Sequence, residues 1–262
     1  MRILIALLTI LLFAAPGLAQ QSSTKSGANH VTWDPSFNSV CQECPLAGLQ
    51  IPFWNIDGAY YAGSDFSNAN LQGVVANQTN FANVVAQGAR FDSAHLTGAH
   101  FMDANLSGAN LHQAEANGAD FTEANLQVAN FVSAKLIGAI LHNVDATGLF
   151  GTEADFSAAN LTGAHFDAAH LNGAIFDSSI LVGARFPGAQ LTDASFRDAR
   201  LVGADLSRAH GYETADFSGA CISNETRLPV GLELPICPDL IVSAPISLIA
   251  TIDNEAGPTD PE

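Results

Sequence analysis

Residues 91–115 read FDSAH LTGAH FMDAN LSGAN LHQAE, and residues 156–190 read FSAAN LTGAH FDAAH LNGAI FDSSI LVGAR FPGAQ. A large apolar residue returns at every fifth position. From residue 46 to residue 206 it is Leu or Phe at 25 of 33 such positions, and the residue two before it is Ala at 23 of 33. A short, strict internal repeat of this kind predicts a repeat architecture.

A period of five fits neither the 3.6-residue period of a helix nor the alternation of a strand. It does fit a chain that turns at a fixed residue and coils around an axis. We call the large apolar residue the centre, position i. The centre and the small residue at i−2 are then expected to point inward, and positions i−1, i+1 and i+2 are expected to face water. These three positions hold mainly Asn, Asp, His, Ser, Thr and Gly, as at Asn110, Thr97 and Gly98.

This pattern resembles the pentapeptide repeat family, whose motif is written A(D/N)LxX. The resemblance covers about two thirds of the chain. It implies an all-β fold, a right-handed four-sided parallel β-helix with four pentapeptides in each coil. Residues 46–206 would make about eight coils, which at the spacing of neighbouring strands form a rod roughly 40 Å long.

A coil of four pentapeptides predicts which side chains stack in neighbouring coils. Two columns of aromatic rings are expected, one of Phe81, Phe101 and Phe121 and one of Phe156, Phe176 and Phe196. Some centres are small, and enlarged i−2 residues often accompany them, so interior volume is roughly kept. The small centres are Ala76, Ala86, Ala116, Ala146 and Gly151, and the enlarged residues are Val74, Val84, Val144 and Leu149.

Outside the repeats the chain divides into four further segments. Residues 1–19 have the shape of a signal peptide, with Arg2, an apolar run and small residues before Gln20. Residues 20–40 are expected to be a flexible mature N-terminus, followed by the β-helix over 41–222 with a one-residue slip after Leu206. Residues 223–253 are expected to form a C-terminal cap of short strands or extended chain without a helix, and 254–262 a disordered tail.

The four cysteines flank the repeats, with Cys41 and Cys44 before them and Cys221 and Cys237 after them. A stiff rod keeps its two ends too far apart for a disulfide. We therefore expect the two local pairs, Cys41 with Cys44 and Cys221 with Cys237, in an oxidising compartment. A redox role for the CxxC motif is the alternative, but the βαβ context of thioredoxin-like sites is not visible.

No group of residues in the sequence has the spacing of a catalytic, cofactor-binding or metal-binding motif. His95, His100, His165 and His170 fall at i−1, so they are expected on the outside and on different walls, where they would not converge on a metal. No nucleophile elbow or phosphate loop occurs. We therefore predict no catalytic, cofactor-binding or metal-binding residues.

The sequence leaves several functions open. Our first hypothesis is a non-catalytic structural or protein-interaction scaffold in the periplasm or outside the cell. An acidic DNA mimic, like family members that protect DNA gyrase, is the second, and the signal-like N-terminus argues against it because gyrase is cytoplasmic. A secreted effector is the third. With 26 acidic and 9 basic residues, the chain is not expected to bind nucleic acid, or a membrane once the signal is removed. An unknown protein partner, or a second copy, is expected instead.

Four apolar side chains break the polarity of the i−1 positions: Ile140, Phe150, Ile175 and Ile180. They could form a shallow patch for a partner or a dimer. Phe150 could instead fold inward, because it lies beside the small centres Ala146 and Gly151. The sequence leaves both alternatives open.

Overall fold

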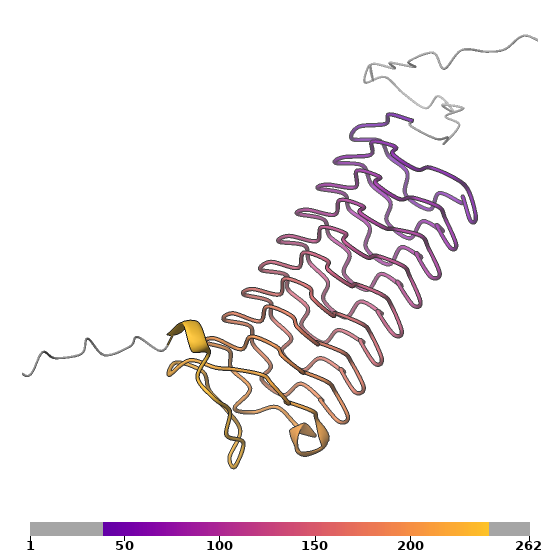
Figure 1. Ribbon diagram of the computed structural model, residues 1–262. Coiled ribbons are helices and arrows are strands. Elements are labelled where there is room, and N and C mark those ends of the chain that lie inside the picture. Colours follow the sequence, from indigo (N-terminus) through magenta and orange to yellow (C-terminus); the bar gives the residue numbers. More distant parts are fainter. Residues whose placement is uncertain (1–38, 241–262) are drawn as a thin grey trace, which may run out of the picture.

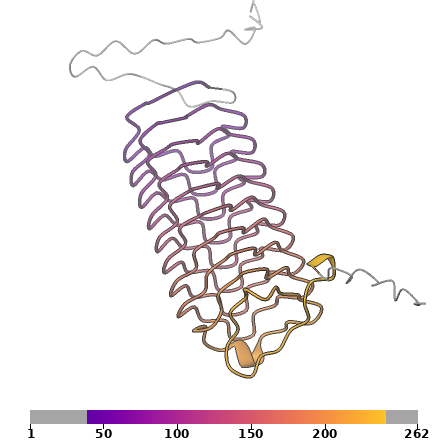
Figure 2. The same ribbon diagram turned by 90° about the vertical axis from the view of Figure 1, so that its left-hand side faces the viewer.

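The computed structural model describes residues 39–240, which form a right-handed four-sided parallel β-helix (Figure 1 and Figure 2). Parallel bridges join equivalent positions of successive coils, from Val40 with Tyr60 to Gln190 with His210. Each wall pairs with the next coil through single bridges, so no longer strand forms within this range. The expected signal peptide, most of the segment 20–40, the end of the cap and the tail lie outside the described residues.

Every corner of the rod is a tight turn with one residue in the left-handed conformation. All residues at i+2 from Glu43 to Gly203 have positive φ. In the turn after Leu106, Gly108 has φ 64° and the N–H of Ala109 donates to the Leu106 carbonyl over 2.9 Å. Positive φ at the third of four residues is the signature of a type II turn. Glycine adopts this conformation freely and Asn and Asp tolerate it, which accounts for their frequency at i+2.

Between the turns, neighbouring coils satisfy each other's backbone. The N–H of a centre donates to a carbonyl in the following coil, as Leu106 N–H does to the Asn125 carbonyl over 2.8 Å. The i−1 residue of that following coil donates back, as Asn125 N–H does to the Ala104 carbonyl over 2.9 Å. Stability therefore accumulates coil by coil, as in other solenoids.

The two predicted aromatic columns are confirmed. The Phe101 ring is stacked on Phe81 and Phe121 with centroids 4.9 and 5.1 Å away, and the Phe176 ring on Phe156 and Phe196 at 5.0 and 4.8 Å. Rings from opposite walls meet edge to face instead, as Phe91 and Phe101 do at 5.8 Å. All of these rings are buried.

The structure also shows that a large residue at i−2 compensates for a small centre. Gly151 is a buried centre without a side chain, and Leu149 at i−2 fills the space. A Cβ added at Gly151 would lie 2.9 Å from the Cδ2 atoms of both Leu149 and Leu171. Leu149 therefore takes the place that a centre side chain normally has.

One inserted residue ends the regular part of the rod. The chain bulges through Gly211, with φ 74°, and the short 3₁₀ helix η1, Tyr212–Thr214. The bridges beyond it are shifted by one position, so that Ser195 pairs with Asp216. The slip predicted after Leu206 is thus confirmed, and the column resumes because Phe217 stacks on Phe196 at 4.9 Å.

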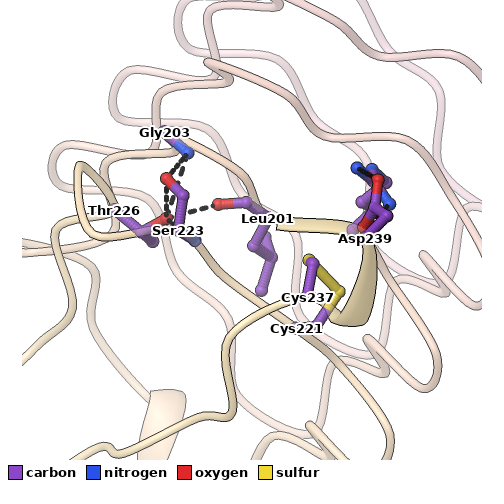
Figure 3. Close-up of a disulfide and its surroundings, with 8 residues drawn as sticks. Leu201, Gly203, Cys221, Ser223, Thr226, Cys237 and Asp239 are labelled. Carbon is purple, nitrogen blue, oxygen red and sulfur yellow. Dashed lines mark hydrogen bonds and ion pairs between the residues drawn. A yellow bond between two sulfur atoms is a disulfide. The ribbon is translucent and has the colours of Figure 1, made fainter. Parts of the chain in front are cut away.

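Residues 223–240 lie across the C-terminal end of the rod (Figure 2). The Thr226 hydroxyl donates to the Leu201 carbonyl over 2.8 Å, and the hydroxyls of Ser223 and Thr226 both accept from Gly203 N–H, so side chains replace a further coil (Figure 3). The segment ends in a second 3₁₀ helix, η2, Pro238–Leu240.

Pro238 has a φ that suits this helical turn. Of the apolar runs that are expected to be short strands or extended chain, only Leu240 falls within η2, so that expectation stays a prediction. The apolar runs expected as strands further on lie almost wholly outside the described residues. No helix within residues 39–240 is long and apolar enough to cross a membrane.

Replacing Phe101 with Ala should destabilise the rod by about 3–5 kcal/mol, because the cavity would lie between two stacked rings that cannot collapse onto each other. Asp103→Asn is the matched control, since Asp103 is exposed and Asn tolerates its φ of 57°. Urea unfolding of both variants measures the difference. Equal losses of stability would show that the assignment of inside and outside is wrong.

Candidate functional site

The outer Asn and Asp residues serve the turns first. At i−1 their side-chain oxygen accepts the backbone N–H of the i+1 residue, as Asp120 does from Thr122 over 2.9 Å and Asn105 does from Ser107 over 3.1 Å. The same bond recurs along the rod at Asp65, Asn70, Asn80, Asn110, Asn125, Asn130, Asp145, Asp155, Asn160, Asp205 and Asp216. Six of the acidic side chains of residues 39–240, Asp65, Asp120, Asp145, Asp155, Asp205 and Asp216, therefore serve the turns.

In some turns the backbone N–H of the i+1 residue donates to a side chain of the preceding coil instead. Asp57 accepts the backbone N–H of Asn77 over 2.7 Å, and Asn77 accepts that of Thr97 over 3.0 Å. Asn117 and Ile137 repeat the arrangement at 3.0 Å. These side chains line one corner and tie successive coils together.

The basic residues are mostly paired with carboxylates of neighbouring coils. Glu115 accepts a hydrogen bond from Lys135 Nζ and faces His95 Nδ1, both at 3.0 Å. Both neighbours lower the pKa of Glu115, and Lys135 has the larger effect. Burial opposes the ionisation of Asp177, but its bonds from Arg197 and Ser195 outweigh burial and lower the pKa. These pairs are exposed, so each contributes little to stability.

Charge is distributed unevenly along the rod. Residues 39–184 contain thirteen acidic side chains and only two basic ones, Arg90 and Lys135. Residues 185–240 contain eight acidic and five basic side chains. The first seven coils are thus strongly negative.

The structure does not bring the four i−1 histidines together. His95, His100, His165 and His170 belong to four different bridge columns, one on each wall. Within residues 39–240, no three His, Cys, Asp or Glu side chains are placed to hold a metal ion.

The four apolar i−1 residues are not brought together either. Ile140 and Ile180 share one column with Asn160 between them, whereas Phe150 and Ile175 lie in two other columns. Phe150 is 44% exposed and stacks on His170 at 5.1 Å. The alternative that Phe150 folds inward is therefore wrong, because Leu149 already fills the interior.

Exposed apolar side chains also lie at the two ends, where the sequence analysis missed them. Phe53 and Trp54, in the first coil, are 72% and 41% exposed, and Val230, in the cap, is 96% exposed. Trp54 occupies an i−2 position, where a small residue is the rule. That violation of the repeat was the available signal.

Both expected cysteine pairs are disulfides in the structure, Cys41 with Cys44 and Cys221 with Cys237. Cys41 and Cys44 take the i and i−2 positions of the first coil. The Ser64 hydroxyl lies between their backbones, since it accepts from Cys44 N–H over 3.0 Å and donates to the Cys41 carbonyl over 2.7 Å. The CxxC pair is thus built into a β-helix corner.

Two open depressions mark the C-terminal part of the surface. One, of about 600 Å³, is lined by Pro187, Gly188, Ser207, Arg208, Ala209 and His210. The other, of about 520 Å³, lies between η1 and the turn 229–232 of the cap. Together with the side walls, these are the candidate contact surfaces.

The turn carboxylates predict how stability depends on pH. The Ser218 hydroxyl and then its backbone N–H lower the pKa of Asp216, and Ser67 lowers that of Asp65 in the same way. A carboxyl with a lower pKa in the folded state stabilises at pH values above its unfolded pKa of about 3.9, and this contribution is lost as the pH falls through the folded pKa. The double variant Asp65→Asn/Asp216→Asn keeps an acceptor for each N–H but cannot titrate.

We therefore expect the melting temperatures of the parent and this variant to converge as the pH is lowered from 7 to about 3. Thermal melts at a series of pH values test this. A constant difference at every pH would contradict it.

The chain was also compared with known proteins. No curated protein matches the chain. Solved structures similar to it include HetL, a pentapeptide repeat protein involved in heterocyst differentiation in the cyanobacterium Nostoc, at 25% identity over 71% of this chain and 88% of that one, with a TM-score of 0.40. A pentapeptide repeat protein of the Arabidopsis thaliana thylakoid lumen is 32% identical over 35% of this chain and 64% of that one, with a TM-score of 0.35.

The fluoroquinolone resistance protein QnrB1 is 19% identical over 61% of this chain and 87% of that one, with a TM-score of 0.45. The family model for pentapeptide repeats matches residues 64–103, 104–143, 154–189 and 189–224, more than half of the chain. The chain belongs to the pentapeptide repeat family.

Proposed function

We propose that this protein is an exported, non-catalytic scaffold that binds another protein along its rod or at its ends, in the periplasm or outside the cell. The observation that carries the proposal is how the outer side chains are used. Most of the polar ones complete turns or pair with the next coil, which leaves firm flat walls. Flat, rigid surfaces suit large protein contacts more than enclosure of a small substrate.

The depressions support the same proposal. Both are open, and neither joins a nucleophile to a base in a buried site. The proposal of export draws on the signal-like residues 1–19 and on the two disulfides, which persist in oxidising compartments. The excess of carboxylates over the first seven coils favours a partner with a basic surface.

Photo-cross-linking in the native host tests the proposal wall by wall. A photoreactive phenylalanine analogue would replace one exposed residue on each of three walls, Val85, Ile140 or Phe150, and one at the cap, Val230. We expect an adduct with one protein species at one or two of these positions, in the extracytoplasmic fraction. The remaining positions are the matched controls.

Two results would contradict the proposal. One is recovery of the protein in the cytoplasm with residues 1–19 retained. The other is the absence of an adduct at all four positions when a control protein carrying the same analogue cross-links to its known partner.

A further inference from the structure

The inserted residue and the cap together build a groove at the C-terminal end. One wall is η1 with the segment that follows it, and the other is the turn 229–232. The groove is open to solvent and has a volume of about 520 Å³. Its main lining residues are Tyr212, Glu213, Asp216, Phe217, Val230 and Leu232.

Covalent and polar links hold the two walls in place. The Tyr212 hydroxyl donates to the Val230 carbonyl over 3.1 Å, across the groove. Gly231 adopts φ 89°, which the turn of the second wall requires, and the Cys221–Cys237 disulfide anchors the cap to the last coil. A preformed groove loses little entropy on binding, so even a small contact area can be effective.

The floor and lip of the groove are apolar. Phe217 is 8% exposed and ends a column of stacked rings, and Leu232 is partly buried against the same core. Val230 is 96% exposed, more than any other large hydrophobic side chain among residues 39–240. The interior does not need Val230, so its position at the tip of a fixed turn suits contact with another molecule.

The rim is acidic and has no basic partner of its own. Glu213 and Asp216 are exposed, and no Lys or Arg lines the groove as the described residues form it. One oxygen of Asp216 accepts from Ser218 N–H and Oγ at 2.9 and 2.5 Å, so the carboxylate is oriented while its other oxygen remains available. Arg197 lies nearby, but its guanidinium is bound to Asp177.

We infer that this groove binds an extended segment of the partner protein in which apolar residues alternate with lysine or arginine. The apolar side chain would lie on Phe217 and Leu232 under Val230, and the flanking cations would meet Glu213 and Asp216. In an extended strand alternate side chains point to opposite sides, so the apolar face meets the floor and the cations point away from it. The long side chains of lysine and arginine can bend back from there to the carboxylates of the rim. The inference rests on the proposed scaffold function and identifies its contact surface and the chemistry of its partner.

Defined peptides test the inference on the full mature protein with both disulfides formed. The probe is the capped peptide Lys-Leu-Lys-Leu-Lys. Capped Glu-Leu-Glu-Leu-Glu and Lys-Ser-Lys-Ser-Lys separate charge from apolar contact. Backbone amide NMR shifts locate binding, and we expect shifts at residues 212–219 and 230–232 with the first peptide alone.

Two variants should weaken this binding by about tenfold each: Val230→Ser, which removes the lip, and Asp216→Asn, which keeps the acceptor for Ser218 but removes the charge. Val230 is exposed, so Val230→Ser should melt close to the parent. Asp216→Asn loses the charge of one turn carboxylate and should melt slightly lower, but it should still be folded at the temperature of the NMR measurement. The matched controls on the side walls are Val128→Ser and Asp103→Asn, and these should bind like the parent.

Absence of shifts at millimolar peptide, equal shifts with the acidic peptide, or shifts only on the side walls would overturn the inference. A photo-adduct on a side wall with a silent groove would leave the scaffold function standing and remove only the groove as its contact surface.

Discussion

Four walls close around an interior that has room for one large and one small side chain in each pentapeptide. Because a tight turn joins each wall to the next and every coil is hydrogen-bonded to its neighbours, the walls cannot move apart to admit more volume. A Phe or Leu at the centre therefore goes with a small residue at i−2, which is mostly Ala and is Ser64, Thr79 or Ser179 at three buried positions. Where the centre is lost, as at Gly151, a larger residue at i−2, Leu149, restores the filling. The ring columns, the turn at every fifth residue and the exposure of the other three positions all follow from this limit.

The same limit explains which features the sequence could predict. The period identified the centres, and the coil of four pentapeptides placed Phe101 on Phe81 and Phe121. The sequence did not resolve Phe150, since two apolar neighbours compete for one interior place. Leu149 takes that place because it falls on the inward side of the backbone. The ends were harder to predict, because the repeat rule stops there: Trp54 occupies an inward position with no coil before it among the described residues, and the groove beside η1 depends on the geometry of one inserted residue.

The turns restrict which residues can occupy the outer positions of the rod. Asn and Asp at i−1 complete the corners, and so an acidic surface arises partly as a consequence of folding. Exposed apolar side chains that the turns do not require lie singly along the walls, as at Val128 and Phe150, and also at the two ends, as at Phe53 and Val230. The C-terminal end differs from the walls because the inserted residue and the cap add a groove with an acidic rim there.

A double-mutant cycle on the exchanged pair tests the interior limit most directly. Leu149→Ala alone should cost about 2–5 kcal/mol through the cavity it leaves, and Gly151→Leu alone about 1–3 kcal/mol through overpacking against Leu149 and Leu171. The double variant restores the ordinary order of small residue and large centre. We predict that it regains most of the lost stability in urea unfolding, with a coupling free energy of at least about 2 kcal/mol. Additive losses in the double variant would contradict the claim that each pentapeptide shares one fixed interior volume.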